Sequence, residues 1–87
     1  MNIWESTILE IVSSNNGVAS LQFIYSKIPL HIDLTDHHLE IKFKAPRYHH
    51  QTRAHIDDLL DSGDLIRVGR GQYSITEKGK RRLSDLK

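Results

Sequence analysis

The chain has 87 residues and no cysteine, which predicts a single domain over residues 1–87 without disulfides or thiolate metal sites. Hydrophobic residues make up 38% and charged residues 26%, as in ordinary globular domains, which argues against a fully disordered chain. No apolar run approaches the roughly 20 residues that cross a bilayer, and the first residues lack the pattern of a signal peptide. We therefore expect a cytoplasmic protein with no membrane partner.

The formal net charge of +1 conceals four blocks of alternating sign. Residues 1–41 carry one lysine against five acids, and residues 42–56 carry four cations and no acid. Residues 57–64 then carry four aspartates, and residues 65–83 carry six cations against one acid. If the two basic blocks meet in space, they form a surface suited to a polyanion.

The first half of the chain predicts two helices. Apolar residues from Ile3 to Val12 follow a helical stripe, and the sequence Asn-Asn-Gly at 15–17 is typical of a left-handed turn that ends a helix. Residues 17–19 could form a short strand. Ser20 then caps a second helix, whose apolar spacing lasts until Pro29.

Residues 30–44 allow two interpretations. Leu39, Ile41 and Phe43 alternate with polar residues as in a strand, whereas Thr35 could cap a short helix. The next element is better defined, because Pro46 suits the first turn of a helix and Gly63 suits its end. The buried stripe of this third helix is expected to contain Tyr48, Thr52, Ile56, Leu59 and Leu60.

The last third of the chain predicts a hairpin and a closing helix. Ile66 and Val68 alternate with polar residues, as do Tyr73 and Ile75, on either side of a Gly-Arg-Gly turn at 69–71. Thr76, followed by Glu77 in the first helical turn, then caps a final helix rich in cations. The predicted fold is an α+β winged helix-turn-helix with three or four helices, a C-terminal β-hairpin wing and a closing helix.

Two segments carry a resemblance to a known family. The string GDLIRVGRGQYSITEKGKRRL at 63–83 looks like the wing and closing helix of winged-helix proteins. Together with LTDHHLEI at 34–41, it makes the chain from about residue 8 to residue 83 resemble the N-terminal domain of Mrr-type restriction enzymes. The resemblance implies a short helix near 34–41 and a DNA-binding role, with a separate nuclease domain in the family. His55 and Ile56 replace the family's usual Trp-Ala pair.

The third helix is the candidate for reading double-stranded DNA, because the N-terminal half of a recognition helix enters the major groove. Helical geometry places Arg53 on the flank of this helix and His49 toward the core. The residues expected to face outward in its first two turns are Arg47, His50, Gln51 and Ala54. The outward residues of its second half are Asp57, Asp58 and Asp61, which would repel phosphate.

The hairpin supplies the second group of candidates. Arg70 lies in the turn, where a long cation can reach a phosphate, and Arg67 and Gln72 are expected on the polar side of the same hairpin. Lys44, just before the third helix, belongs to the first basic block. Cations of the closing helix are weaker candidates for phosphate contact: Lys78, Lys80, Arg81 and Arg82. Four or five phosphate contacts would make log affinity fall against log salt with a slope of about −4.

Several alternatives remain open. Arg47 and Arg53 could be solvated or paired with nearby aspartates. The six histidines invite a metal site, but their spacing fits no standard motif, so we expect no metal and no other cofactor. His50 beside phosphate would bind better below about pH 6.5 if it must be protonated. No catalytic motif is present, so we expect no enzyme activity.

The main competing function is a winged helix that binds protein. Trp4, with Ile3 and Ile8, could form a dimer interface, or Trp4 could simply complete the core. Because one small domain makes few base contacts, we also expect a homodimer or a tethered nuclease or effector domain for sequence-specific binding.

Overall fold

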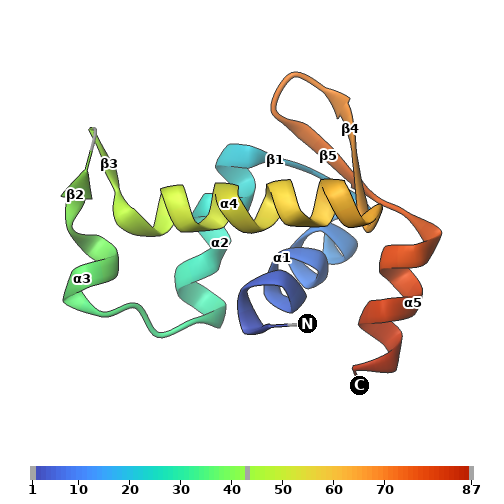
Figure 1. Ribbon diagram of the computed structural model, residues 1–87, viewed down its shortest axis with the longest axis horizontal. Coiled ribbons are helices and arrows are strands. Elements are labelled where there is room, and N and C mark those ends of the chain that lie inside the picture. The colour runs from blue at the N-terminus through green and yellow to red at the C-terminus, as the bar shows by residue number, and fades with distance from the viewer. Residues whose placement is uncertain (1, 43, 87) are drawn as a thin grey trace.

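The computed structural model describes residues 2–42 and 44–86, which form an α+β domain with five helices and a small antiparallel sheet (Figure 1). The predicted α+β class is confirmed. The helices are α1 (Ile3–Ser14), α2 (Leu21–His31), α3 (Asp36–Leu39), α4 (Arg47–Ser62) and α5 (Glu77–Asp85). The strands are β1 (Val18–Ser20), β2 (Ile41–Lys42), β3 (Ala45–Pro46), β4 (Leu65–Gly69) and β5 (Gln72–Ile75). No helix in these described residues is long and apolar enough to cross a membrane.

The main sheet joins the predicted hairpin to the short strand after α1. Its order is β1-β5-β4, with both pairings antiparallel, so β5 is the central strand. Val18 lies opposite Ser74 on one side of β5, and Ile66 lies opposite the same serine on the other side. A bulge between Arg67 and Gly69 interrupts the regular pairing near the hairpin turn. The short strand predicted at residues 17–19 is confirmed, and its observed bounds, Val18–Ser20, lie one residue later in the sequence.

Local capping explains most helix boundaries. Ser20 and Thr76 accept backbone hydrogen bonds as N-caps of α2 and α5, as predicted. Asn16 and Gly17 both have positive φ after α1, which confirms the left-handed turn. Gly63 has a φ of 82° and ends α4, in the left-handed conformation that glycine adopts without steric cost.

The predicted end of α2 at Pro29 is wrong. The helix continues to His31, and the amide of Ile32 still donates to the carbonyl of Ile28. Pro29 lies in the last turn with an exposed ring, so it costs one internal hydrogen bond while the following turn closes normally.

Both interpretations of residues 30–44 are right in part. Thr35 caps the short helix α3, and its backbone amide donates to the ring of His38 in a reciprocal capping box. The alternating segment forms only the two-residue strand β2, paired with β3. Phe43, which we expected in this strand, lies outside the described residues.

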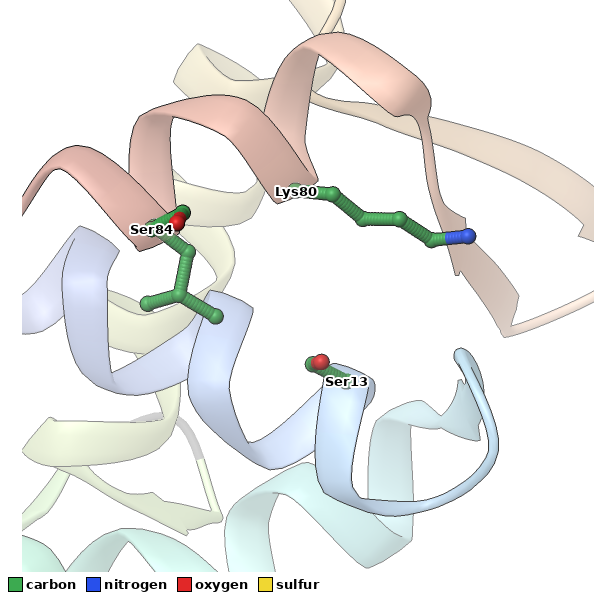
Figure 2. A pocket seen from close by; sticks show the side chains of 4 residues that line it. Ser13, Lys80 and Ser84 are labelled. Atoms are coloured by element: carbon green, nitrogen blue, oxygen red, sulfur yellow. The ribbon is translucent and has the colours of Figure 1, made fainter.

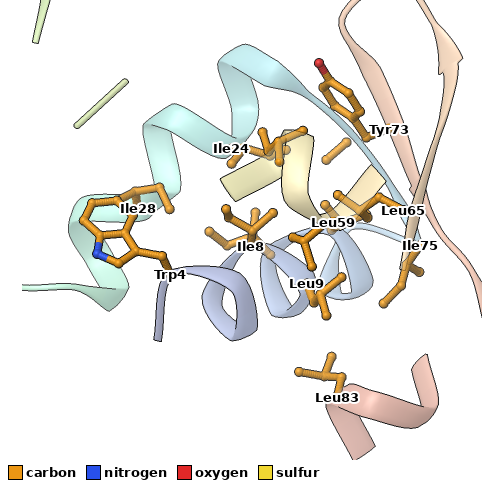
Figure 3. Close-up of a cluster of buried hydrophobic side chains, with 14 of the residues drawn as sticks. Trp4, Ile8, Leu9, Ile24, Ile28, Leu59, Leu65, Tyr73, Ile75 and Leu83 are labelled. Atoms are coloured by element: carbon orange, nitrogen blue, oxygen red, sulfur yellow. The ribbon is translucent and has the colours of Figure 1, made fainter. Parts of the chain in front are cut away.

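The hydrophobic core lies where α1 meets α2, α4, the sheet and α5 (Figure 3). Its fully buried side chains include Ile8, Leu9, Ile24, Ile28, Ile56, Leu59 and Leu65. Trp4 is only 8% exposed and packs in this cluster. Of the two alternatives for Trp4, the structure supports the one in which it completes the core. The apolar stripe of α1 packs inside the domain, and only Ile3 is exposed among Ile3, Trp4 and Ile8.

Helix α5 is attached to the rest of the domain through the turn after α4. Asp64 is fully buried, and its Oδ2 accepts hydrogen bonds from Arg82 and from the Ser62 hydroxyl. The Thr76 hydroxyl donates toward the carbonyls of Gly63 and Asp64. These contacts fix where the hairpin leaves α4, because the same turn begins β4.

Candidate nucleic-acid interface

Helix α4 runs along the long dimension of the molecule, with the β2–β3 pair near its first turn and the β4–β5 hairpin rising over its C-terminal half (Figure 1). Its buried stripe contains Thr52, Ile56 and Leu59, while Tyr48 and Leu60 are partly buried. The predicted core face of this helix is thus confirmed. The opposite face and both flanks carry the candidate DNA contacts.

Arg47 is less available than the sequence predicts. Its side chain is one-third exposed, its Nε lies 3.6 Å from Glu40, and its backbone amide donates to the Glu40 carbonyl. The Nε atom is buried and finds no hydrogen-bond partner among residues 2–42 and 44–86. Arg47 therefore faces the segment after α3, because the chain turns back there to begin α4.

The remaining predicted residues of the first basic block differ in exposure. A ring nitrogen of His50 lies 2.7 Å from the carbonyl oxygen of Lys42, which ties the first turns of α4 to β2. Lys44 is exposed and has a φ of 68°, at the turn between β2 and β3. Ala54 is exposed and Gln51 is half-buried. The outward direction predicted for His50 and Ala54 agrees with this exposure.

His49 and Arg53 lie one helical turn apart on the flank of α4 that faces α2. The His49 ring stacks on Tyr25 of α2, with centroids 3.9 Å apart and planes 5° apart, so its predicted inward direction is confirmed. Burial lowers the pKa of His49, and the neighbouring His50 lowers it further. Arg53 is exposed and influences Tyr25 electrostatically, which agrees with its predicted place on this flank.

Two tyrosines connect α4 to the hairpin. Burial raises the pKa of Tyr25, the charge of Arg53 partly offsets that rise, and Tyr73 of β5 adds to it. Arg67 of β4 lies across from Tyr73, with its guanidinium carbon 5.8 Å from the centre of the tyrosine ring. Arg53, from the first basic block, thus influences Tyr25, and Arg67, from the second, lies over the ring of Tyr73.

The register of the hairpin corrects one prediction. Arg67 pairs with Tyr73, so both side chains share one face of the sheet, the face that also carries buried Leu65. Gln72 is the neighbour of Tyr73 and lies on the opposite face. Arg67 and Gln72 therefore lie on opposite faces of the hairpin and do not share a polar side. Arg67 is exposed although its face of the sheet also carries buried residues. Arg70 is exposed in the turn, as expected.

The cations of α5 mostly pair with acceptors of the domain itself. The Lys78 ammonium donates to the carbonyl of Ser62, Lys80 pairs with Glu77 at 3.3 Å, and Arg82 pairs with buried Asp64. Arg81 is exposed. Three of these four side chains therefore contact the domain itself: two bind the end of α4 or the turn after it, and Lys80 binds the first turn of α5. The second half of α4 is acidic on its surface, as predicted, with Asp57, Asp58 and Asp61 all exposed.

Sequence reasoning missed the two tyrosines and Glu40. Tyr25 and Tyr73 occupy apolar positions of a helix and a strand, so their spacing indicates core, and both are indeed buried. Their placement between the basic blocks depends on how α2 packs against the sheet. The pairing of Glu40 with Arg47 could have been anticipated only from the reversal of the chain at β2–β3.

A shallow pocket lies away from this surface, between the end of α1 and α5 (Figure 2). Its lining residues are Ser13, Lys80, Leu83 and Ser84. Its volume of 220 Å³ is below the roughly 300 Å³ at which small-molecule sites begin. Comparisons with protein-family models, curated proteins and solved structures find no significant match.

Proposed function

We propose that this chain is a non-enzymatic, winged-helix DNA-binding domain. In this proposal the first two turns of α4 enter the major groove, and the β4–β5 hairpin acts as a wing that contacts the phosphate backbone. Following the resemblance to Mrr-type N-terminal domains, we propose that it serves as a small regulator or as the targeting module of a restriction-modification system.

The order of the elements supports the proposal. A winged helix needs a recognition helix followed directly by an antiparallel hairpin, and α4 leads into β4 and β5 through a turn of two residues. The third strand, β1, precedes α2 and pairs with β5, which fixes the hairpin against the helical core.

The observation that carries the proposal is the placement of exposed cations on both elements that a winged helix uses: Arg53 on the flank of α4 and Arg67 over Tyr73 in the hairpin. These cations are separated by an acidic block in the sequence, yet both are exposed, and Arg53 and Tyr73 both influence the pKa of Tyr25. A polyanion that follows α4 toward the hairpin would meet Arg53, Arg67 and then Arg70. Phosphate contacts of this kind orient a protein on DNA before bases are read.

The charge distribution of α4 limits how the helix can approach DNA. Asp57 and Asp61 are exposed in its second half and would repel phosphate. Gln51 and Ala54, in the first two turns, are the candidates for contact with base edges. The proposal therefore places the helix with its N-terminal half deeper in the groove.

The test is fluorescence anisotropy with mixed 20-base-pair duplexes at two salt concentrations. We expect the double variant Arg53→Gln, Arg67→Gln to bind at least tenfold more weakly than the wild type. The matched control is Lys80→Gln, Arg81→Gln on α5, which removes the same charge from exposed positions. Circular dichroism first establishes that each variant is folded. Equal losses in both double variants, or no binding by the wild type at low salt, would contradict the proposal.

One observation favours a protein-binding role as the second candidate. Val18, Ile66 and Val68 are all exposed apolar residues of the sheet, and Val18 and Ile66 flank Ser74 on the same face. Such exposed side chains are a common feature of interaction surfaces. If duplex DNA does not bind, a pull-down with wild type against Ile66→Ser is the next experiment, and equal capture of partners by both would contradict this role for the face.

A further inference from the structure

A histidine and two carboxylates meet where the first turn of α1 contacts the middle of α4. His55 Nδ1 lies 3.2 Å from Glu5 Oε2 and 3.9 Å from Asp58 Oδ2. One ligand atom from each of the three side chains lies within 4.8 Å of the other two. Glu5 and His55 are 50 positions apart in the sequence, so the cluster exists only in the folded domain.

Two of the three side chains are held in place by other contacts. The His55 ring is stacked on Trp4, with centroids 6.0 Å apart and planes at 16°. Asn2 donates a hydrogen bond to Glu5 Oε2 at 3.0 Å, while its own side chain caps the amide of Glu5. The side chains of His55 and Glu5 are only 19% and 17% exposed. Their ligand atoms are thus oriented before any cation arrives, which reduces the conformational entropy lost on binding.

Asp58 completes the cluster from the solvent side. It lies three residues after His55 on the same helix, and its side chain is 65% exposed. Because an exposed carboxylate rotates freely, it can close the remaining gap to a cation without moving the backbone. His38 approaches Trp4 from α3, but its Nδ1 accepts the hydrogen bond from Thr35.

We propose that Glu5, His55 and Asp58 form a binding site for a divalent transition-metal cation of the Zn²⁺ type. Imidazole nitrogen with carboxylate oxygen is a donor set that Zn²⁺ accepts at about 2.0 to 2.2 Å, with water filling the open position. Ligand atoms around such a cation lie about 3 to 3.5 Å apart in tetrahedral geometry. The His55–Glu5 separation already matches this value, and the Asp58 carboxylate needs only a small rotation.

The bound cation would join α1 to α4, because one ligand comes from α1 and two come from α4. A ligand that binds only the folded chain stabilises it, so the midpoint of thermal unfolding rises with the logarithm of the free ligand concentration once that exceeds the dissociation constant. Zn²⁺ should therefore stabilise the α1–α4 contact directly under the helix proposed to read DNA. This inference does not depend on the proposed function, since its readouts require no DNA.

The experiment is calorimetric titration of the chelator-treated full chain with ZnCl₂ at neutral pH, followed by thermal unfolding. We expect one Zn²⁺ per chain, a raised unfolding midpoint, and at least tenfold weaker binding in Asp58→Asn and in His55→Gln. Asp58→Asn changes an exposed side chain, so it tests the site even if His55→Gln destabilises the fold. The matched controls are Asp57→Asn, the exposed neighbour of Asp58, and His37→Gln on α3.

A spectroscopic readout identifies the ligand directly. In two-dimensional NMR spectra, we expect Zn²⁺ to shift the ring resonances of His55 and not those of His31, which is exposed at the end of α2. Absence of Zn²⁺ binding would overturn the proposal. So would binding that is unchanged in Asp58→Asn and His55→Gln, or that is lost in His37→Gln, since each result would leave Glu5 and His55 as an ion pair only.

Discussion

Two groups of cations in this domain have different roles. Arg53 and Arg67 lie exposed beside buried tyrosines, at the surface between α4 and the hairpin. Lys78, on α5, instead binds the carbonyl of the last residue of α4, and Arg82 binds the buried carboxylate of the turn that follows. The comparison shows that the density of cations along a chain does not indicate their availability, which depends on the acceptors that the fold places beside them.

The difference has a physical origin. Asp64 is fully buried, and its Oδ1 has no hydrogen-bond partner in the described part of the chain. Removing the guanidinium of Arg82 would therefore leave a buried charge with little solvation. Arg53, by contrast, pairs with no buried carboxylate in residues 2–42 and 44–86. Substitutions in α5 should therefore change folding stability, and substitutions at the α4–hairpin surface should change binding.

The largest expected effect is on the attachment of α5. A methyl group at Gly79 would overlap the carbonyl oxygen of Asp64 and approach Ile75 Cγ1 to 2.9 Å. Although alanine favours helices, we expect Gly79→Ala to lower the free energy of unfolding by about 3 kcal/mol, because the backbone must shift. Urea unfolding measures this loss. The control is Gly71→Ala, which has open space around it but a positive φ and should cost only about 1 kcal/mol. A smaller loss at Gly79 than at Gly71 would show that α5 is loosely attached.

Breaking the pair between Arg82 and Asp64 should have the next largest effect. We expect Arg82→Met to cost about 2 kcal/mol, below the usual value for a fully buried pair because the Arg82 side chain is 35% exposed. Arg81→Met, at the exposed neighbouring position, should cost less than about 0.5 kcal/mol. Equal losses in chemical unfolding would mean that the ion pair contributes nothing specific.

At the α4–hairpin surface, the expected change is in the salt dependence of binding. With phosphate contacts from Lys44, Arg53, Arg67 and Arg70, log affinity should fall against log salt with a slope of about −3.6. Removing Arg53 and Arg67 together should reduce the slope to about −1.8, with unfolding free energy changed by less than about 1 kcal/mol. Anisotropy titrations from 50 to 200 mM salt measure the slope. An unchanged slope would exclude these two arginines from the phosphate contacts.

Much of the fold could be predicted because its determinants are local. The caps at Ser20 and Thr76 and the left-handed Gly63 depend on one or two neighbouring residues, and all three are confirmed. The effect of Pro29 was harder to predict. A proline in the last turn removes one internal hydrogen bond, but α2 still closes its final turn between Ile28 and Ile32. Residues 30–44 were ambiguous because their spacing suits both a capped helix and a strand, and each is present for a few residues.

The candidate sites were harder to predict, because they depend on contacts between distant segments. Arg47 lies on the outward side of an isolated helix, but the reversal at β2–β3 brings Glu40 beside it. A bulge and the register of the hairpin place Arg67 on the side of Tyr73. The contact between Glu5 and His55 could not be predicted from local spacing for the same reason, since the two residues are 50 positions apart in the sequence.

The smallest expected effect concerns the stacked pair beneath Arg53. Burial, and then His50, lower the pKa of His49 below its ordinary value of 6.5, so the unfolded chain binds a proton there more readily than the folded chain. The stabilising contribution of neutral His49 is therefore fully present above about pH 6.5 and is lost as the pH falls below that value. His49→Phe keeps an aromatic ring on Tyr25 without a titrating group. Urea unfolding between about pH 7.5 and pH 5 should show a smaller loss of stability in His49→Phe than in the wild type. Parallel curves for the two proteins would mean that the stacked ring is protonated as easily in the folded domain as in the unfolded chain, and that the surface between α2 and α4 admits water as far as Tyr25.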